Sequence, residues 1–143
     1  MKPGSLGADS LPPNYQALLE KAVAAIDNAY APYSGVRIGA AIRTASGGSY
    51  SGANVENASY GLTICAERSA VFSAVAAEGP NMRLTALAVA ADPSSISASP
   101  CGACRQVLLE FASDAEVIYQ EPPGIRRVAL NDLLPEAFRL RRP

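Results

Sequence analysis

The hydrophobic residues of this chain follow helical spacing in some segments and strand spacing in others. Helical spacing predicts three helices, and Asn131 is positioned to cap a short fourth one. Strand-length apolar stretches predict five strands. The helices are expected over residues 14–29, 65–77, 101–112 and from 131 onward, and the strands over residues 36–44, 50–55, 84–91, 115–119 and 127–130. The predicted order is α-β-β-α-β-α-β-β-α.

The connections between these elements predict how the strands pair. The Ser-Gly-Gly turn at 46–48 is so short that its strands must form an antiparallel hairpin. Residues 84–91 are almost continuously apolar, which is typical of a central strand covered on both faces. The two connections that carry a helix are expected to be right-handed crossovers with parallel strands, and the short turn at 122–124 makes the last strand antiparallel. The predicted fold class is α/β, a three-layer α/β/α sandwich around one mixed five-stranded sheet.

Composition and charge narrow the class of protein. A chain of 143 residues fits one domain, so we expect a flexible N-terminal arm over 1–13 and a single domain over 14–143. The net charge of −1 argues against binding to nucleic acid or to an anionic membrane surface. No apolar run reaches the about 18 residues that a membrane helix needs. The start of the chain does not resemble an export signal, so we expect a cytoplasmic protein.

With three cysteines and no histidine, the soft ligands available to a transition metal are nearly limited to the thiolates of Cys65, Cys101 and Cys104. Each of the two cysteine segments opens a predicted helix, where the positive end of the helix dipole favours a thiolate. Cys101 and Cys104 are three residues apart and therefore share one helix face. Three protein ligands leave one position of a tetrahedral zinc open, which is typical of catalytic rather than structural zinc.

Charged residues lie beside these cysteines. Glu67, two residues after Cys65, is poorly placed as a second ligand from the same turn but well placed as a proton carrier. Three thiolates weaken the pull of zinc on a bound water, and Arg68 and Arg105 are expected to donate to thiolates and draw charge back.

Other interpretations of the cysteines remain open at this point. Cys-Gly-Ala-Cys at 101–104 also fits a thioredoxin-like redox pair. All three cysteines are also compatible with inert positions in the core. A structural zinc site is compatible with the sequence only if a carboxylate supplies the fourth ligand.

Longer motifs show a family resemblance. Asn-Val-Glu-Asn-Ala-Ser-Tyr at 54–60, Cys-Ala-Glu-Arg at 65–68 and Pro-Cys-Gly-Ala-Cys-Arg-Gln-Val at 100–107 resemble the small homotetrameric cytidine deaminases. These belong to the zinc-dependent cytidine and deoxycytidylate deaminase superfamily. The likeness runs from about Tyr15 to Phe138, and further matches lie at 33–34, 39–41 and 133–138.

The resemblance implies a reaction and a cofactor. The expected reaction is the zinc-dependent hydrolytic deamination of cytidine and deoxycytidine to uridine and deoxyuridine, in pyrimidine salvage, with one zinc per chain. Water attacks C4 of the cytosine ring, and Glu67 takes a proton from the water, passes it to N3 and then helps to protonate the leaving ammonia.

The resemblance also implies how the nucleoside is held. Asn54 and Glu56 are expected to bind the ribose 3′-hydroxyl, and Ala66 to contact the substrate. Tyr60 is expected to reach a 5′-hydroxyl across a subunit interface, and Phe138 to cap the site of a neighbour. The expected assembly is a homotetramer whose pockets are completed by neighbouring subunits.

Val36 departs from the family pattern. Two residues after Tyr33-Ser34 the family usually has an aromatic residue that stacks on the pyrimidine, and valine has no π-face. We expect weaker nucleoside binding or stacking from elsewhere, such as Phe138. The departure leaves room for a deaminase of a cytosine-containing antibiotic such as blasticidin S. A non-catalytic zinc-binding assembly protein is a further alternative, although Glu67 argues against it.

Overall fold

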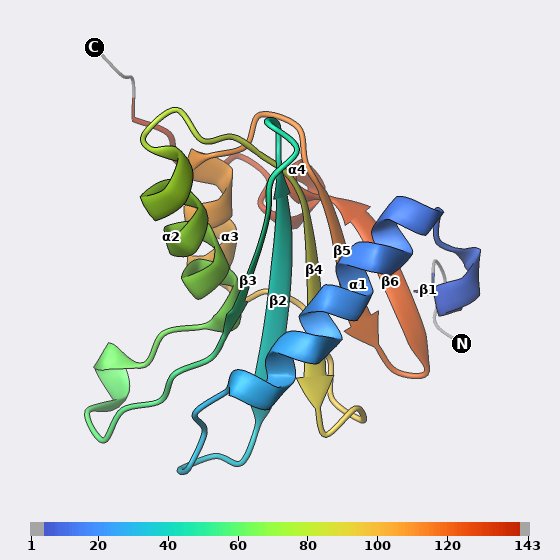
Figure 1. Ribbon diagram of the computed structural model, residues 1–143, viewed down its shortest axis with the longest axis vertical. Helices are drawn as coiled ribbons and strands as arrows, with labels where there is room; N and C mark the ends of the chain where they lie inside the picture. The colour runs from blue at the N-terminus through green and yellow to red at the C-terminus, as the bar shows by residue number, and fades with distance from the viewer. Residues whose placement is uncertain (1–4, 141–143) are drawn as a thin grey trace.

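The computed structural model describes residues 5–140 of the chain (Figure 1). The elements in chain order are β1 (Ser5–Leu6), α1 (Pro13–Ala25), β2 (Arg37–Thr44), β3 (Ser49–Ala53), α2 (Ala66–Glu78), β4 (Leu84–Asp92), α3 (Gly102–Glu110), β5 (Glu116–Glu121), β6 (Gly124–Ala129) and α4 (Leu130–Leu133). Short 3-10 helices occupy Ala8–Ser10, Ile26–Asn28 and Tyr60–Leu62. From α1 to α4 the order of helices and strands is the predicted one.

The strands form one mixed sheet in the order β1-β6-β5-β4-β2-β3. The five predicted strands are confirmed, and the two-residue β1 extends the sheet along β6. The β2–β3 and β5–β6 pairs are antiparallel and the β4–β5 pair is parallel, as predicted. The crossover through α2 differs from the prediction, because β4 pairs antiparallel with β2 rather than with β3. β3 and β4 run in the same direction, but β2 lies between them.

Helices cover both faces of the sheet, with α1 on one face and α2 and α3 on the other (Figure 1). Alternation along β4 points Leu87 and Val89 into the core under α2 and α3, and Ala88 and Ala90 toward α1. Small residues let α1 approach the sheet closely. A Cβ at Gly39 would lie only 2.0 Å from the carbonyl oxygen of Ala22 in α1, so no side chain fits there.

Helix α2 approaches β3 equally closely, at Gly52. A Cβ at this glycine would lie 2.6 Å from the carbonyl oxygen of Ala66 and 2.5 Å from the amide nitrogen of Ala70. Both atoms are backbone atoms of the first part of α2, which cannot move without moving the helix. The missing side chain of Gly52 therefore sets the position of the N-terminus of α2, where Cys65 lies.

The N-terminal segment was expected to be a flexible arm over residues 1–13. Residues 1–4 lie outside the described part of the chain. From residue 5 the segment forms β1 and a 3-10 turn, and Leu11 is 3% exposed in the core under α1. Flexibility and the domain boundary stay predictions, but Leu6 and Leu11 pack against the core under α1. Within residues 5–140, no helix is long and apolar enough to cross a membrane.

Candidate metal centre and active site

The three cysteines, which are far apart in the sequence, lie together at the N-termini of α2 and α3. Cys65 is the N-cap residue of α2, Cys101 is the N-cap residue of α3, and Cys104 lies in the first turn of α3. Their Sγ atoms all lie within 4.8 Å of one another, and those of Cys101 and Cys104 are 3.4 Å apart. Both helices start beside the carboxyl ends of the parallel strands β4 and β5, a common place for a site in α/β folds (Figure 1).

The cluster fits a zinc ion. Zinc–sulfur bonds of about 2.3 Å at tetrahedral angles place the sulfurs about 3.8 Å apart, close to the spacing seen here. The thiols of Cys65 and Cys104 do not titrate alike. A hydrogen bond from Cys104, and to a smaller extent one from Arg68, lowers the pKa of Cys65. The hydrogen bond to Cys65 and burial in turn raise the pKa of Cys104. One thiolate is stable without a cation, and a divalent cation would stabilise all three.

The two arginines beside the cysteines have different roles. Arg68 donates from Nη2 to the Sγ of Cys65 over 3.0 Å, the contact expected from the sequence, and its role in balancing thiolate charge stays a prediction. The prediction for Arg105 is not met, because its hydrogen bonds run elsewhere. Its Nε donates to the carbonyl of Pro100 at 2.7 Å, Nη1 to that of Leu133 at 2.7 Å and Nη2 to Ser99 Oγ at 2.9 Å. Arg105 therefore ties the loop before Cys101 to α4.

Glu67 lies in the same small cavity as Cys65 and Cys101. It is only 5% exposed, and burial raises the pKa of its carboxyl group. The cavity has a volume of about 210 Å³ and is lined by Ile38, Asn54, Thr63, Cys65, Ala66, Glu67, Val89, Ser97, Ala98, Ser99 and Cys101. A buried carboxyl group beside thiolates, with its pKa raised above the ordinary value, is suited to carry a proton in general acid–base chemistry. Ala66, also predicted as a substrate contact, lies in this wall.

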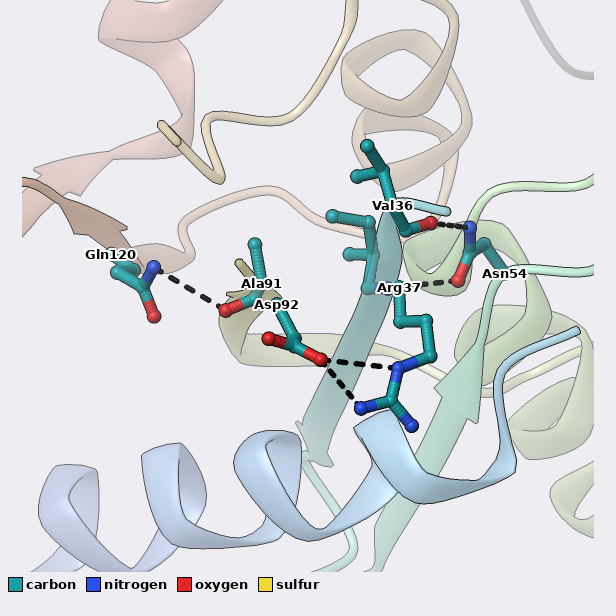
Figure 2. Close-up of polar contacts among 7 residues, drawn as sticks. Val36, Arg37, Asn54, Ala91, Asp92 and Gln120 are labelled. Atoms are coloured by element: carbon teal, nitrogen blue, oxygen red, sulfur yellow. Dashed lines mark hydrogen bonds and ion pairs between the residues drawn. The ribbon is translucent and has the colours of Figure 1, made fainter. Parts of the chain in front are cut away.

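Asn54 lines the cavity and also holds the start of β2. Its Oδ1 accepts from the amide of Ile38 at 2.8 Å, and its Nδ2 donates to the carbonyl of Val36 at 2.9 Å (Figure 2). Arg37, between these two residues, is paired with Asp92 at the end of β4 over 2.5 Å. Val36 is half-buried, while the cavity itself is lined by Ile38. Asn54 thus fixes the segment that carries both apolar side chains.

Glu56 lies in a second cavity, of about 390 Å³, which adjoins the first at Thr63. Its carboxylate accepts hydrogen bonds from the amides of Tyr33 and Ser34 and from the Ser34 hydroxyl. These bonds, that of the hydroxyl first, lower the pKa of Glu56. Tyr60 lines the same cavity, with its ring edge against Tyr33 at 6.1 Å between centroids. The predicted nucleoside contacts are therefore divided between two adjoining cavities.

Tyr60 and Phe138 are both on the surface. Their side chains are 75% and 70% exposed, unusual for large apolar residues. Phe138 lines neither cavity, and its backbone carbonyl accepts from the Gln106 side chain at 3.0 Å. Within this one chain, Phe138 is not brought to the cysteine cavity.

Sequence reasoning missed six residues that line the cavity beside Glu67. These are Ile38, Thr63, Val89, Ser97, Ala98 and Ser99. Ser97 and Ser99 lie between the predicted strand over 84–91 and the predicted helix over 101–112. Their position just before Cys101 was the only feature of the sequence that could have indicated that they line the cavity. A loop that carries a metal ligand at its end also passes close to the metal.

Comparisons with known proteins agree with this geometry. The family model of the cytidine and deoxycytidylate deaminase zinc-binding region matches residues 12–121. A cytidine deaminase of Halalkalibacterium halodurans is 45% identical over 125 residues, which are 86% of this chain and 92% of that protein. A probable cytidine deaminase of Dictyostelium discoideum is 43% identical, with 86% of this chain and 85% of that protein covered.

Solved structures show the same fold. The crystal structure of cytidine deaminase from Burkholderia pseudomallei is 46% identical, with a TM-score of 0.79 over 87% of this chain and 98% of that one. That from Mycobacterium tuberculosis is 42% identical, with a TM-score of 0.77 over 90% of this chain and all of that one. With its three clustered cysteines and a family match over most of its length, the chain belongs to the zinc-binding cytidine and deoxycytidylate deaminase family.

Proposed function

We propose that this protein is a zinc-dependent hydrolase that converts cytidine and deoxycytidine to uridine and deoxyuridine, as in pyrimidine salvage. The observation that carries the proposal is the buried carboxyl group of Glu67 in one cavity with the three-cysteine cluster. A cysteine cluster alone is compatible with a structural metal site, and a buried carboxyl group alone is compatible with a residue that has only a structural role in the core. Together in a cavity they fit hydrolysis, in which water must lose one proton and the leaving group must gain one.

Cys65, Cys101 and Cys104 are the residues proposed to hold zinc, which when bound supplies a Lewis acid that makes water more acidic. Glu67 is proposed to take the proton of the attacking water, to pass it to N3 of the base and to help protonate the departing ammonia. Burial suits Glu67 to this task, because the raised pKa of the carboxyl group lets it both accept and release a proton. Arg68 holds Cys65 as a thiolate.

The nucleoside is proposed to lie across the two adjoining cavities, with the base beside Glu67 and the sugar toward Glu56. The Ala66 backbone and the Asn54 side chain lie in the wall of the first cavity. Glu56 offers a carboxylate acceptor for a sugar hydroxyl in the second. Val36 stands where an aromatic residue would stack on the base, so apolar contact from the β2 start replaces stacking.

The assembly is proposed to be a homotetramer in the cytoplasm, with neighbours completing each pocket. The exposed side chains of Tyr60, Leu62 and Phe138 support an interface, since large exposed apolar side chains favour a covering partner. Tyr60 and Phe138 are the proposed contributions to neighbouring sites. Light scattering of the purified protein measures the assembly, and a monomer at micromolar concentration would contradict this part of the proposal.

The substrate is tested by measuring the deamination of three candidate compounds by one protein sample whose zinc content is known. Loss of absorbance is followed with cytidine, deoxycytidine and blasticidin S. The proposal predicts turnover of the two nucleosides with about one zinc per chain. The alternative of an antibiotic deaminase, left open by Val36, predicts turnover of blasticidin S alone. A zinc-loaded protein that turns over none of the three would support a binding or assembly role instead.

A further inference from the structure

One wall of the cysteine cavity is a loop between β4 and α3, residues 93–101. Ser97, Ala98 and Ser99 of this loop line the cavity, and the loop leads directly to Cys101. Because the segment lacks helix or strand hydrogen bonds of its own, its shape depends on bonds from outside it.

Gln120, near the end of β5, supplies several of these bonds. Its Nε2 donates to the carbonyl of Ser94 at 2.9 Å and lies 3.5 Å from those of Ala91 and Ile96. Its backbone carbonyl accepts from the amide of Ala98 at 2.8 Å. Figure 2 shows the Gln120 amide group directed at the end of β4, where Ala91 precedes the loop. One residue thus contacts both the beginning of the loop and the part that lines the cavity.

Glu121, the next residue, holds the loop through a side chain. The hydroxyl of Ser97 donates to its carboxylate, and Ser97 Oγ also lies within hydrogen-bond distance of the amide of Ser99, at 3.3 Å. Alternation along β5 places Gln120 and Glu121 on opposite faces of the sheet, so the loop is held from two sides.

These bonds decide what the wall offers to a ligand. Ser97 gives its one proton to Glu121, so its oxygen remains an acceptor. Ser99 Oγ accepts from Arg105, so its own proton remains available for donation. The wall presents one acceptor and one donor close together. A cytosine base has the complementary groups, since its amino group donates and its N3 and O2 accept.

We propose that Gln120 is a positioning residue for the substrate, because it holds the wall that carries the hydroxyls of Ser97 and Ser99 against the base. The inference rests on the proposed function. Gln120 itself lines neither the cysteine cavity nor the Glu56 cavity, and it acts through the loop. It therefore governs the binding of the nucleoside, while the cysteine cluster and Glu67 stay in place.

The test uses zinc-loaded protein with Gln120→Met, which keeps the length of the side chain but removes its donor. The KM for cytidine should rise about tenfold, the size expected for the loss of one hydrogen bond. The kcat should stay within about twofold of the unchanged enzyme, and zinc content should stay at about one per chain. Gln120→Glu also lacks the donor and should raise KM at least as much, because its carboxylate faces carbonyl oxygens.

A second readout needs no substrate. Hydrogen exchange measured by mass spectrometry should become about tenfold faster in residues 94–99 of Gln120→Met, because a lost hydrogen bond lowers the cost of local opening. The matched control is Gln16→Met. Gln16 Nε2 also donates to a backbone carbonyl, that of Leu11 at 2.7 Å, but it lines neither cavity. This control should leave both KM and the exchange of residues 94–99 unchanged.

Each outcome separates the inference from the proposed function. Faster exchange in residues 94–99 together with a raised KM supports the inference. Unchanged exchange in Gln120→Met overturns it, and so does faster exchange with an unchanged KM. If the unaltered protein turns over no cytidine, the proposed function fails, and with it the role toward substrate. The exchange measurement then still decides whether Gln120 holds the wall.

Discussion

The guanidinium group of Arg68 donates to the sulfur of Cys65 over 3.0 Å, across the first turn of α2. The two residues are three apart, so the helix itself brings them together. The hydrogen bond and the positive charge of Arg68 both stabilise Cys65 as a thiolate, and both lower its pKa. Arg68 itself is not a proposed metal ligand, but through this contact it affects how tightly Cys65, a proposed ligand, binds the metal.

Arg68→Gln is therefore expected to weaken zinc binding by about 10- to 100-fold, the usual effect of losing a residue that supports a metal ligand. Competition with a chromophoric chelator measures the affinity. Arg83→Gln is the control, because Arg83 donates to the carbonyl of Met82 beyond the other end of α2. Equal zinc affinity in Arg68→Gln and the unaltered protein would show that the contact does not support the metal site.

Gly52→Ala is expected to destabilise the protein by about 1–3 kcal/mol, the usual cost of overpacking. The new Cβ would meet backbone atoms of α2 at 2.5 and 2.6 Å, so the helix must shift. Urea unfolding measures the loss of stability, and zinc content measures the effect on Cys65. A Cβ at Gly61 has no atom within 4 Å, so Gly61→Ala serves as the control. The account of α2 placement fails if the two variants are equally stable.

Acid stability should depend on Glu78, at the C-terminal end of α2. Its carboxylate accepts from the hydroxyls of Thr44 and Tyr50, each at 2.8 Å, and these bonds lower its pKa. A carboxyl group whose pKa is lower in the folded than in the unfolded state stabilises the fold at pH values above both pKa values. This stabilisation is lost as the pH falls through the folded pKa, below about 4.5.

Glu78→Gln removes this titration, so the urea midpoint of the unaltered protein should fall more steeply below about pH 5 than that of the variant. Unfolding at a series of pH values from neutral to acid measures both curves. Parallel curves would mean that the Thr44 and Tyr50 contacts contribute nothing that depends on the charge of Glu78.

The order of helices and strands, the mixed sheet and the proximity of Cys101 to Cys104 could be predicted from local patterns, whereas Cys65 joins them only through the packing of α2 beside α3. Apolar periodicity and turn residues are properties of short segments, and Cys101 and Cys104 meet through helix geometry alone. The insertion of β2 between β3 and β4 could not be predicted in this way, because strand order depends on how whole layers pack. The predicted hydrogen bond from Arg105 to a thiolate was wrong for a related reason. Arg105 instead donates to the carbonyl of Leu133, which belongs to a distant segment of the chain.

The departure at Val36 gives a prediction about binding. Val36→Phe should lower the KM for cytidine by about 5- to 150-fold, since stacking of one base on an aromatic side chain contributes about 1–3 kcal/mol. Val36→Leu is the control, because it adds apolar volume without a π-face. Steady-state kinetics on zinc-loaded protein measures both variants. A KM that is unchanged by phenylalanine would mean that this position does not face the base.

The central claim is that Glu67 moves protons in a cavity whose metal is held by the three cysteines. The most direct measurement compares Glu67→Gln with the unaltered protein for cytidine turnover and zinc content. Glu78→Gln, in the last turn of the same helix, is the matched control. The account predicts about one zinc per chain in all three proteins, and a loss of about 10²–10⁴ in kcat for Glu67→Gln alone. Near-normal turnover by Glu67→Gln with zinc in place would contradict it.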